Sequence, residues 1–100
     1  MFNMVTEWRV EKYITMIRIT AILKSDNLDI VARIMEPFLM NKMLELIDAS
    51  IKYKGKLIGS FPIEMPKEAK AMYVHVCMIF ETDELVENFK KEIPKVLEQG

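Results

Sequence analysis

Glycine, cysteine and histidine are scarce in this chain, and each shortage excludes a class of site. The three glycines (Gly55, Gly59 and Gly100) are too few and too scattered for a glycine-rich phosphate-binding loop. The single cysteine, Cys77, has no partner for an internal disulfide, which favours a reducing, cytoplasmic location. With His75 as the only histidine, a metal site built from Cys and His would need two copies of the chain.

Net charge and long apolar runs are also lacking. The formal net charge of −1 gives no overall attraction to nucleic acid or to an anionic membrane. No uncharged apolar run approaches the roughly 20 residues of a membrane span, and no signal peptide is evident at the start, so we expect no membrane contact. A length of 100 residues predicts one domain, with residues 1–6 as a possible tail. The high content of Lys, Glu and Ile is typical of proteins from thermophilic organisms.

The clearest strand in the sequence is Lys70–Glu81, and it contains both His75 and Cys77. Its even-numbered positions from 72 to 80 are all apolar, which predicts a face buried in the core. Its odd-numbered positions carry Tyr73, His75, Cys77 and Ile79 and no charge before Glu81. A strand face exposed to water normally carries charged side chains, so we expect this second face to be covered by a partner.

The other elements follow from periodicity and from the prolines. Trp8–Leu23 reads as one long strand, with a bulge or bend near Glu11–Lys12 and with the first residues as a possible separate edge piece. A helix is expected from Leu28 to about Ser50, either kinked at Pro37 or divided there into two helices. Ser50–Glu64 is the next extended segment, unless Lys54-Gly55 forms a tight hairpin turn.

A last helix begins near Thr82 or Asp83, either of which can cap it. Its apolar positions are spaced three and four residues apart, and they predict packing on the even-numbered face of the 70–81 strand. The fold class is therefore α+β: a two-layer sandwich of an antiparallel sheet with both helices on one face, in the order β-α-β-β-α. That order is similar to the small dimerising subunit of the KEOPS tRNA-modification complex and to a trimmed ferredoxin-like fold. The resemblance rests on element order alone, and no residue role follows from it.

The second sheet face supplies the main candidates for contact with a partner or ligand. They are Met16, Arg18, Tyr73, His75 and Cys77. Met40 and Met43 are candidates on the first helix, whose Phe38–Ile47 half is apolar around most of its circumference. Three alternate lysines, Lys52, Lys54 and Lys56, could instead bind single-stranded nucleic acid, although lysines also keep edge strands soluble.

Catalytic patterns are absent from the sequence. No paired carboxylates and no nucleophile elbow occur, and the His75–Cys77 pair has no third group to orient it. We therefore predict no catalytic residue, metal or cofactor. The expected role is a non-catalytic domain that forms a homodimer or binds another protein. The alternatives are a ligand site or small enzyme with a pocket near His75, and nucleic-acid binding through the lysines.

Overall fold

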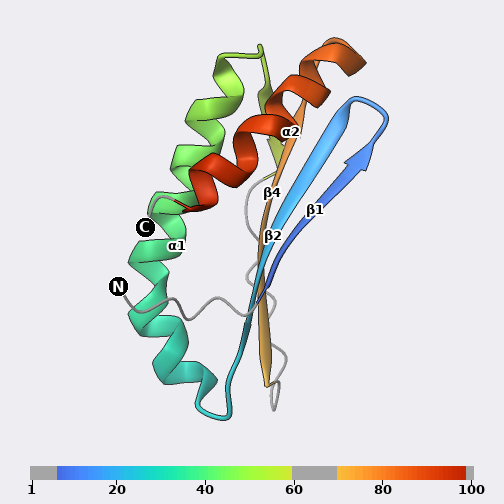
Figure 1. The fold of residues 1–100 in the computed structure, drawn as a ribbon. Helices are drawn as coiled ribbons and strands as arrows, with labels where there is room; N and C mark the ends of the chain where they lie inside the picture. The colour runs from blue at the N-terminus through green and yellow to red at the C-terminus, as the bar shows by residue number, and fades with distance from the viewer. Residues whose placement is uncertain (1–6, 60–69, 99–100) are drawn as a thin grey trace.

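A computed structural model describes residues 7–59 and 70–98 (Figure 1). The order is β1 (Glu7–Tyr13), β2 (Met16–Lys24), α1 (Leu28–Ile51), β3 (Lys56–Gly59), β4 (Ala71–Ile79) and α2 (Asp83–Glu98). The strands form one antiparallel sheet in the order β1-β2-β4-β3, and both helices lie on the same side of it (Figure 1). The predicted α+β class and two-layer arrangement are confirmed. The possible tail at 1–6 lies outside the described residues.

The prediction of one long strand over Trp8–Leu23 is wrong, because the chain there forms a hairpin of two strands. The alternative of a separate edge piece at its start agrees with β1, which lies at the edge of the sheet. Tyr13 pairs with Met16, so only Ile14 and Thr15 form the turn. Ile14 adopts a left-handed backbone with φ of 56°, which β-branched residues rarely do. The turn therefore lacks the glycine or asparagine that normally marks a two-residue hairpin, and this is why the sequence did not reveal it. The order gains one strand and becomes β-β-α-β-β-α.

Helix α1 continues through Pro37 without interruption. The prediction of two separate helices is therefore wrong. Pro37 is exposed on the side of α1 away from the sheet, where its missing N–H and its ring leave the buried face intact. Leu39, Met43 and Leu46 continue the core contacts of α1 beyond the proline.

The segment after α1 is a helix-ending turn rather than the start of a strand. Gly55 N–H bonds the Ser50 carbonyl at 2.9 Å, and Lys54 N–H bonds the Ile51 carbonyl at 3.0 Å. With Lys54 in the left-handed conformation (φ 61°), this is a Schellman motif, which satisfies the last helical carbonyls. The predicted turn at Lys54-Gly55 exists, but it joins a helix to β3 and not two strands. The predicted extended segment therefore begins only at Lys56, and its end at 60–64 lies outside the described residues.

The core lies between the sheet and the two helices. The even-numbered residues of β4 and the odd-numbered residues 17–23 of β2 face the helices, and all are buried. Val86, Phe89, Ile93 and Val96 make the buried stripe of α2, as predicted. Thr82 is the N-cap of that helix, since its Oγ1 accepts a bond from Leu85 N–H at 3.2 Å.

Two lysines add polar links, one between the sheet and α2 and the other between the two helices. Lys12 of β1 forms ion pairs with Asp83 and Glu87 at the start of α2. Lys42, buried on α1, donates to the Val96 carbonyl at 2.9 Å and pairs with Glu45. Val96 lies in the last turn of α2, so Lys42 supplies a donor to a carbonyl that the helix itself leaves unpaired.

Candidate interaction surface

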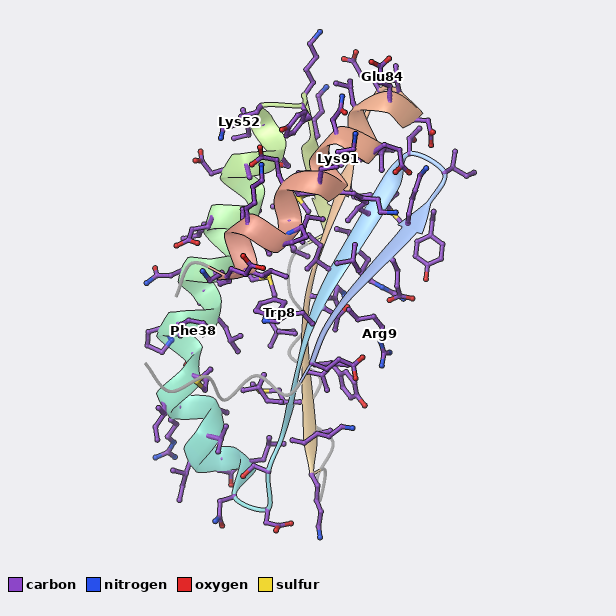
Figure 2. All side chains as sticks on the ribbon, viewed as in Figure 1. Trp8, Arg9, Phe38, Lys52, Glu84 and Lys91 are labelled. Carbon is purple, nitrogen blue, oxygen red and sulfur yellow. The ribbon has the colours of Figure 1, made fainter. Side chains whose placement is uncertain are left out.

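The sheet face away from the helices is the candidate interaction surface, called the open face below. Figure 2 shows how alternation divides the residues of β1: Trp8 projects towards the helices and Arg9 projects to the opposite side. The register places the odd-numbered residues of β1 and β4 and the even-numbered residues of β2 together on the open face. No helix of the described residues covers this face (Figure 1).

The β4 half of the open face is largely apolar. Ile79 is 40% exposed and lies opposite Met16, which is half-buried. Tyr73 is 39% exposed at the other end of the strand and lies opposite Ile22, which is buried. His75 and Cys77 fill the space between these ends, and both are half-buried. Water therefore reaches part of a nearly uncharged strip that runs the length of β4.

The β1 half of the open face is charged, but its charges are paired. Arg18 donates two hydrogen bonds to Glu11 at 2.9 and 3.1 Å, and the Tyr13 hydroxyl donates to the same carboxylate at 2.7 Å. The hydrogen bond from Tyr13, together with that from Arg18, lowers the pKa of Glu11, and the bond to Glu11 raises the pKa of Arg18. Arg9 pairs with Glu7 at 3.1 Å in the same way. The charges of these two pairs cancel.

Of the sequence candidates, five are brought together on this face. Arg18 lies opposite Cys77 and Met16 lies opposite Ile79, while Tyr73, His75 and Cys77 occupy alternate positions of β4. The partners of Arg18 on β1, Glu11 and Tyr13, were missed as members of the surface. Their pairing with Arg18 depends on the hairpin turn at Ile14. The signal in the sequence is the pair of opposite charges, Glu11 and Arg18, at positions that a turn at residues 14 and 15 places opposite each other.

The two methionine candidates on α1 differ in their exposure to solvent. Met43 is completely buried against the core, so its prediction as a contact residue is wrong. Met43 lies four residues after Leu39 and three before Leu46, so it belongs to the buried stripe of α1. Met40 is 38% exposed and lines a groove between α1 and β4.

The predicted row of three lysines on one strand is not formed. Lys52 and Lys54 lie in the turn that ends α1, and only Lys56 belongs to β3 (Figure 2 labels Lys52). Helical and turn geometry point these side chains in different directions, which removes the alternating row that nucleic-acid binding required.

Metal or covalent chemistry has little support in this geometry. Within 7–59 and 70–98 there is no group of three or more His, Cys, Asp or Glu side chains placed to hold a metal ion. One cavity lies between α1 and β4 and another lies between α1 and α2, and His75 lines neither of these two. Among the described helices, none combines the length and hydropathy that a membrane span requires.

Comparison with known proteins identifies no relative of this chain. No protein-family model, no curated protein and no solved structure matches the chain. The function is therefore argued from the residues of the chain alone.

Proposed function

We propose that this protein is a non-catalytic domain that forms a homodimer through the open face of its sheet. The observation that carries the proposal is the apolar strip along β4, where Tyr73 and Ile79 remain about two-fifths exposed on a face without a helical cover. Burying such side chains stabilises an association by roughly 25 cal/mol for each Å² of apolar surface. We propose a second copy of the chain as the partner because twofold homodimers are the commonest assemblies of soluble proteins.

The charges on the open face are compatible with self-pairing. Glu7, Arg9, Glu11 and Arg18 form two internal ion pairs, so two copies can meet without a net repulsion between like charges. Lys56, which pairs with Ile79 across β3 and β4, lies at the exposed edge and can remain in water. This arrangement of an apolar centre and a polar rim is typical of protein interfaces.

The size of the face indicates a weak dimer. The strands have 7, 9, 4 and 9 residues, and at about 3.3 Å per residue and about 4.8 Å between strands they give a projected area of roughly 450 Å². A stable interface buries roughly 800 Å² on each partner. We therefore expect a dimer whose dissociation constant lies in the micromolar range and whose mass depends on concentration.

Sedimentation equilibrium from about 1 µM to about 1 mM tests the proposal. The wild-type protein should shift from monomer to dimer across this range. Ile79→Lys should raise the dissociation constant at least about tenfold, because it places a charge within the apolar strip that the second copy would cover. Ile30→Lys is the matched control, since Ile30 is 60% exposed on α1 and lies outside the open face.

Two results would contradict the proposal. One is a monomer at every concentration. The other is a dimer that dissociates in the Ile30→Lys variant and survives in Ile79→Lys, which would move the interface to the outer side of α1.

A further inference from the structure

Helix α1 is apolar on two opposite sides. One side packs on the sheet and supplies the core residues of the helix. The other side carries four large aliphatic side chains that are between 56% and 62% exposed: Ile30, Ile34, Leu44 and Ile51. A surface helix of a globular protein normally has a single apolar stripe, and its opposite side is polar. The outer apolar row of α1 adds little to the core and therefore indicates a contact surface.

This outer row has the spacing of a coiled-coil seam. Seven exposed positions follow one another at alternating intervals of four and three residues, and we call them the outer seam: Ile30, Ile34, Pro37, Asn41, Leu44, Asp48 and Ile51. Positions spaced in this way repeat about every 3.5 residues and stay on one side of a helix along its length. From residue 30 to residue 51 the seam is about 32 Å long.

A helix is the occupant that fits this shape. The side chains of a partner helix insert between side chains spaced three and four residues apart, whereas a strand has a period of two. A membrane surface fits less well, because helices that lie on membranes carry Lys and Arg beside their apolar side. The exposed charges of α1 are mainly carboxylates instead: Asp29, Glu36, Glu45 and Asp48.

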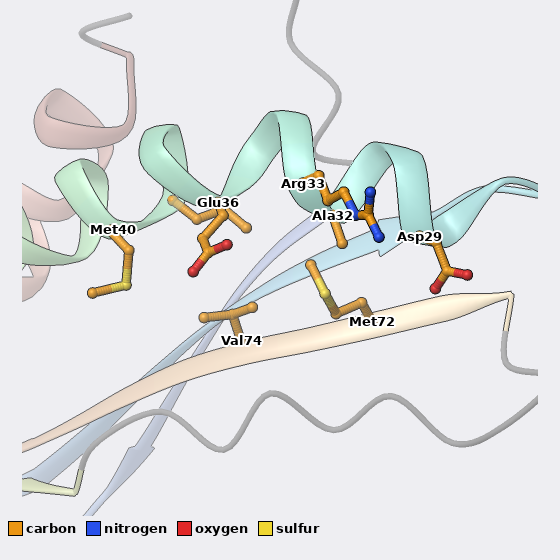
Figure 3. A pocket seen from close by; sticks show the side chains of 8 residues that line it. Asp29, Ala32, Arg33, Glu36, Met40, Met72 and Val74 are labelled. Carbon is orange, nitrogen blue, oxygen red and sulfur yellow. The ribbon is translucent and has the colours of Figure 1, made fainter.

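The polar members of the outer seam define the sequence of the partner. Asp48 is exposed within the seam, so a Lys or Arg at the facing position complements its charge. Asn41 lies near the middle of the seam, where an asparagine fixes the register by favouring a polar residue opposite. The seam itself contains no cation. Figure 3 shows that Arg33 lines the groove between α1 and β4 instead.

A second copy of α1 does not complement the seam. In a parallel pair each seam residue meets its own equivalent, so Asp48 would face the same carboxylate of the other copy. In an antiparallel pair Asp48 would face an apolar residue of the first turns, such as Ile30 or Ile34. Both arrangements leave the charge of Asp48 without an opposite charge within the seam, which favours a different protein as the partner.

We propose that the outer seam binds an amphipathic helix of another protein, with apolar residues at heptad spacing and a Lys or Arg opposite Asp48. The seam is about 32 Å long and a helix is about 10 Å wide, so the contact covers roughly 320 Å² on each partner. A stable interface buries roughly 800 Å² on each side. We therefore expect a reversible association with a dissociation constant in the micromolar range or weaker.

A designed helical peptide of about 24 residues, long enough to follow the whole seam, tests the proposal. It carries leucine at its seam positions, except for an asparagine opposite Asn41 and a lysine opposite Asp48, and it is made for both the parallel and the antiparallel orientation. We expect one orientation to bind saturably below about 1 mM in fluorescence anisotropy. A peptide with glutamate in place of that lysine should bind at least about fivefold more weakly. The absence of saturable binding in both orientations overturns the proposal.

Matched variants assign the binding to the seam. Leu44→Lys places a charge in its middle and should weaken peptide binding at least about tenfold. Ile79→Lys is the control, because Ile79 is exposed on the open face and lies outside the seam. Asp48→Lys should reverse the preference, so that the glutamate peptide binds more tightly than the lysine peptide, and a defect in folding cannot imitate this result. An unchanged preference in Asp48→Lys, or full binding by Leu44→Lys, refutes the site.

The outer seam can fail independently of the proposed dimer. If Leu44→Lys abolishes self-association while Ile79→Lys leaves it unchanged, α1 pairs with a second copy and the proposal of a different partner is wrong. If the lysine peptide binds as expected and sedimentation shows only monomer, the seam stands and the dimer does not.

Discussion

A methyl group added at Gly55 should destabilise the fold, because the Phe80 ring already occupies the space. A Cβ built on Gly55 lies 2.7 Å from Phe80 Cε2 and 3.0 Å from Ser50 Cβ. Carbon atoms in contact normally lie about 3.5–4.0 Å apart, so the ring would have to move by most of an ångström. Phe80 is itself buried, and its ring centroid lies 5.2 Å from that of Phe89. The ring is therefore held on both sides.

The expected cost of Gly55→Ala is about 1–3 kcal/mol, the usual range for overpacking a buried site. For a chain of this length each kcal/mol lowers the melting temperature by about 4–8 °C. The residue before it should respond in the opposite direction. Lys54 holds a left-handed backbone with φ of 61°, which glycine adopts without a steric cost, so Lys54→Gly should stabilise by about 0.5–1 kcal/mol.

Thermal and urea unfolding of the two variants, followed by circular dichroism, measures both effects. The matched pair separates packing from backbone strain, because the two substitutions alter neighbouring positions of one turn. A Gly55→Ala protein as stable as the wild type would refute the packing argument. A Lys54→Gly protein less stable than the wild type would refute the argument from backbone conformation.

Two further predictions concern the polar links that Lys42 and Lys12 make with α2. Lys42→Met should lower the free energy of unfolding by about 1–3 kcal/mol in urea titrations, because it leaves the buried Val96 carbonyl without this donor; an unchanged midpoint would contradict that role. The hydrogen bond from Lys12 lowers the pKa of Glu87, so the stability from this pair is present above the ordinary glutamate pKa and is lost as pH falls through the lowered value. Lys12→Met should therefore flatten the loss of stability in acid, and an unfolding series between about pH 6 and pH 2 that stays parallel to the wild type would count against the linkage.

Much of the fold was predictable because its signals are local. The apolar residues at even-numbered positions predict the buried side of β4, and the three-and-four spacing predicts the buried side of α2. Both sides are buried in the structure. Thr82 was one of two caps expected for α2, and its hydroxyl makes the bond. The sequence likewise indicated that the other face of β4 is poor in charge, which is the basis of the proposed interface.

What escaped prediction depends on contacts between distant segments. The turn at Ile14 has the composition of a strand, and only the pairing of β1 with β2 and the ladder to β4 shows that the chain reverses there. Lys54 takes a conformation that favours glycine because it holds the left-handed position of the Schellman motif that ends α1.

Patterning by itself determined the layers: a period of two for strands and of 3.6 for helices decides which side chains must leave water. Tertiary structure alone decided that Met43 is core, that the three lysines do not share a face, and that α1 and β4 line a groove. The physical reason is that hydrophobic burial has no direction. It selects the face of each element, whereas register, turn geometry and the pairing of backbone groups determine which faces and edges meet.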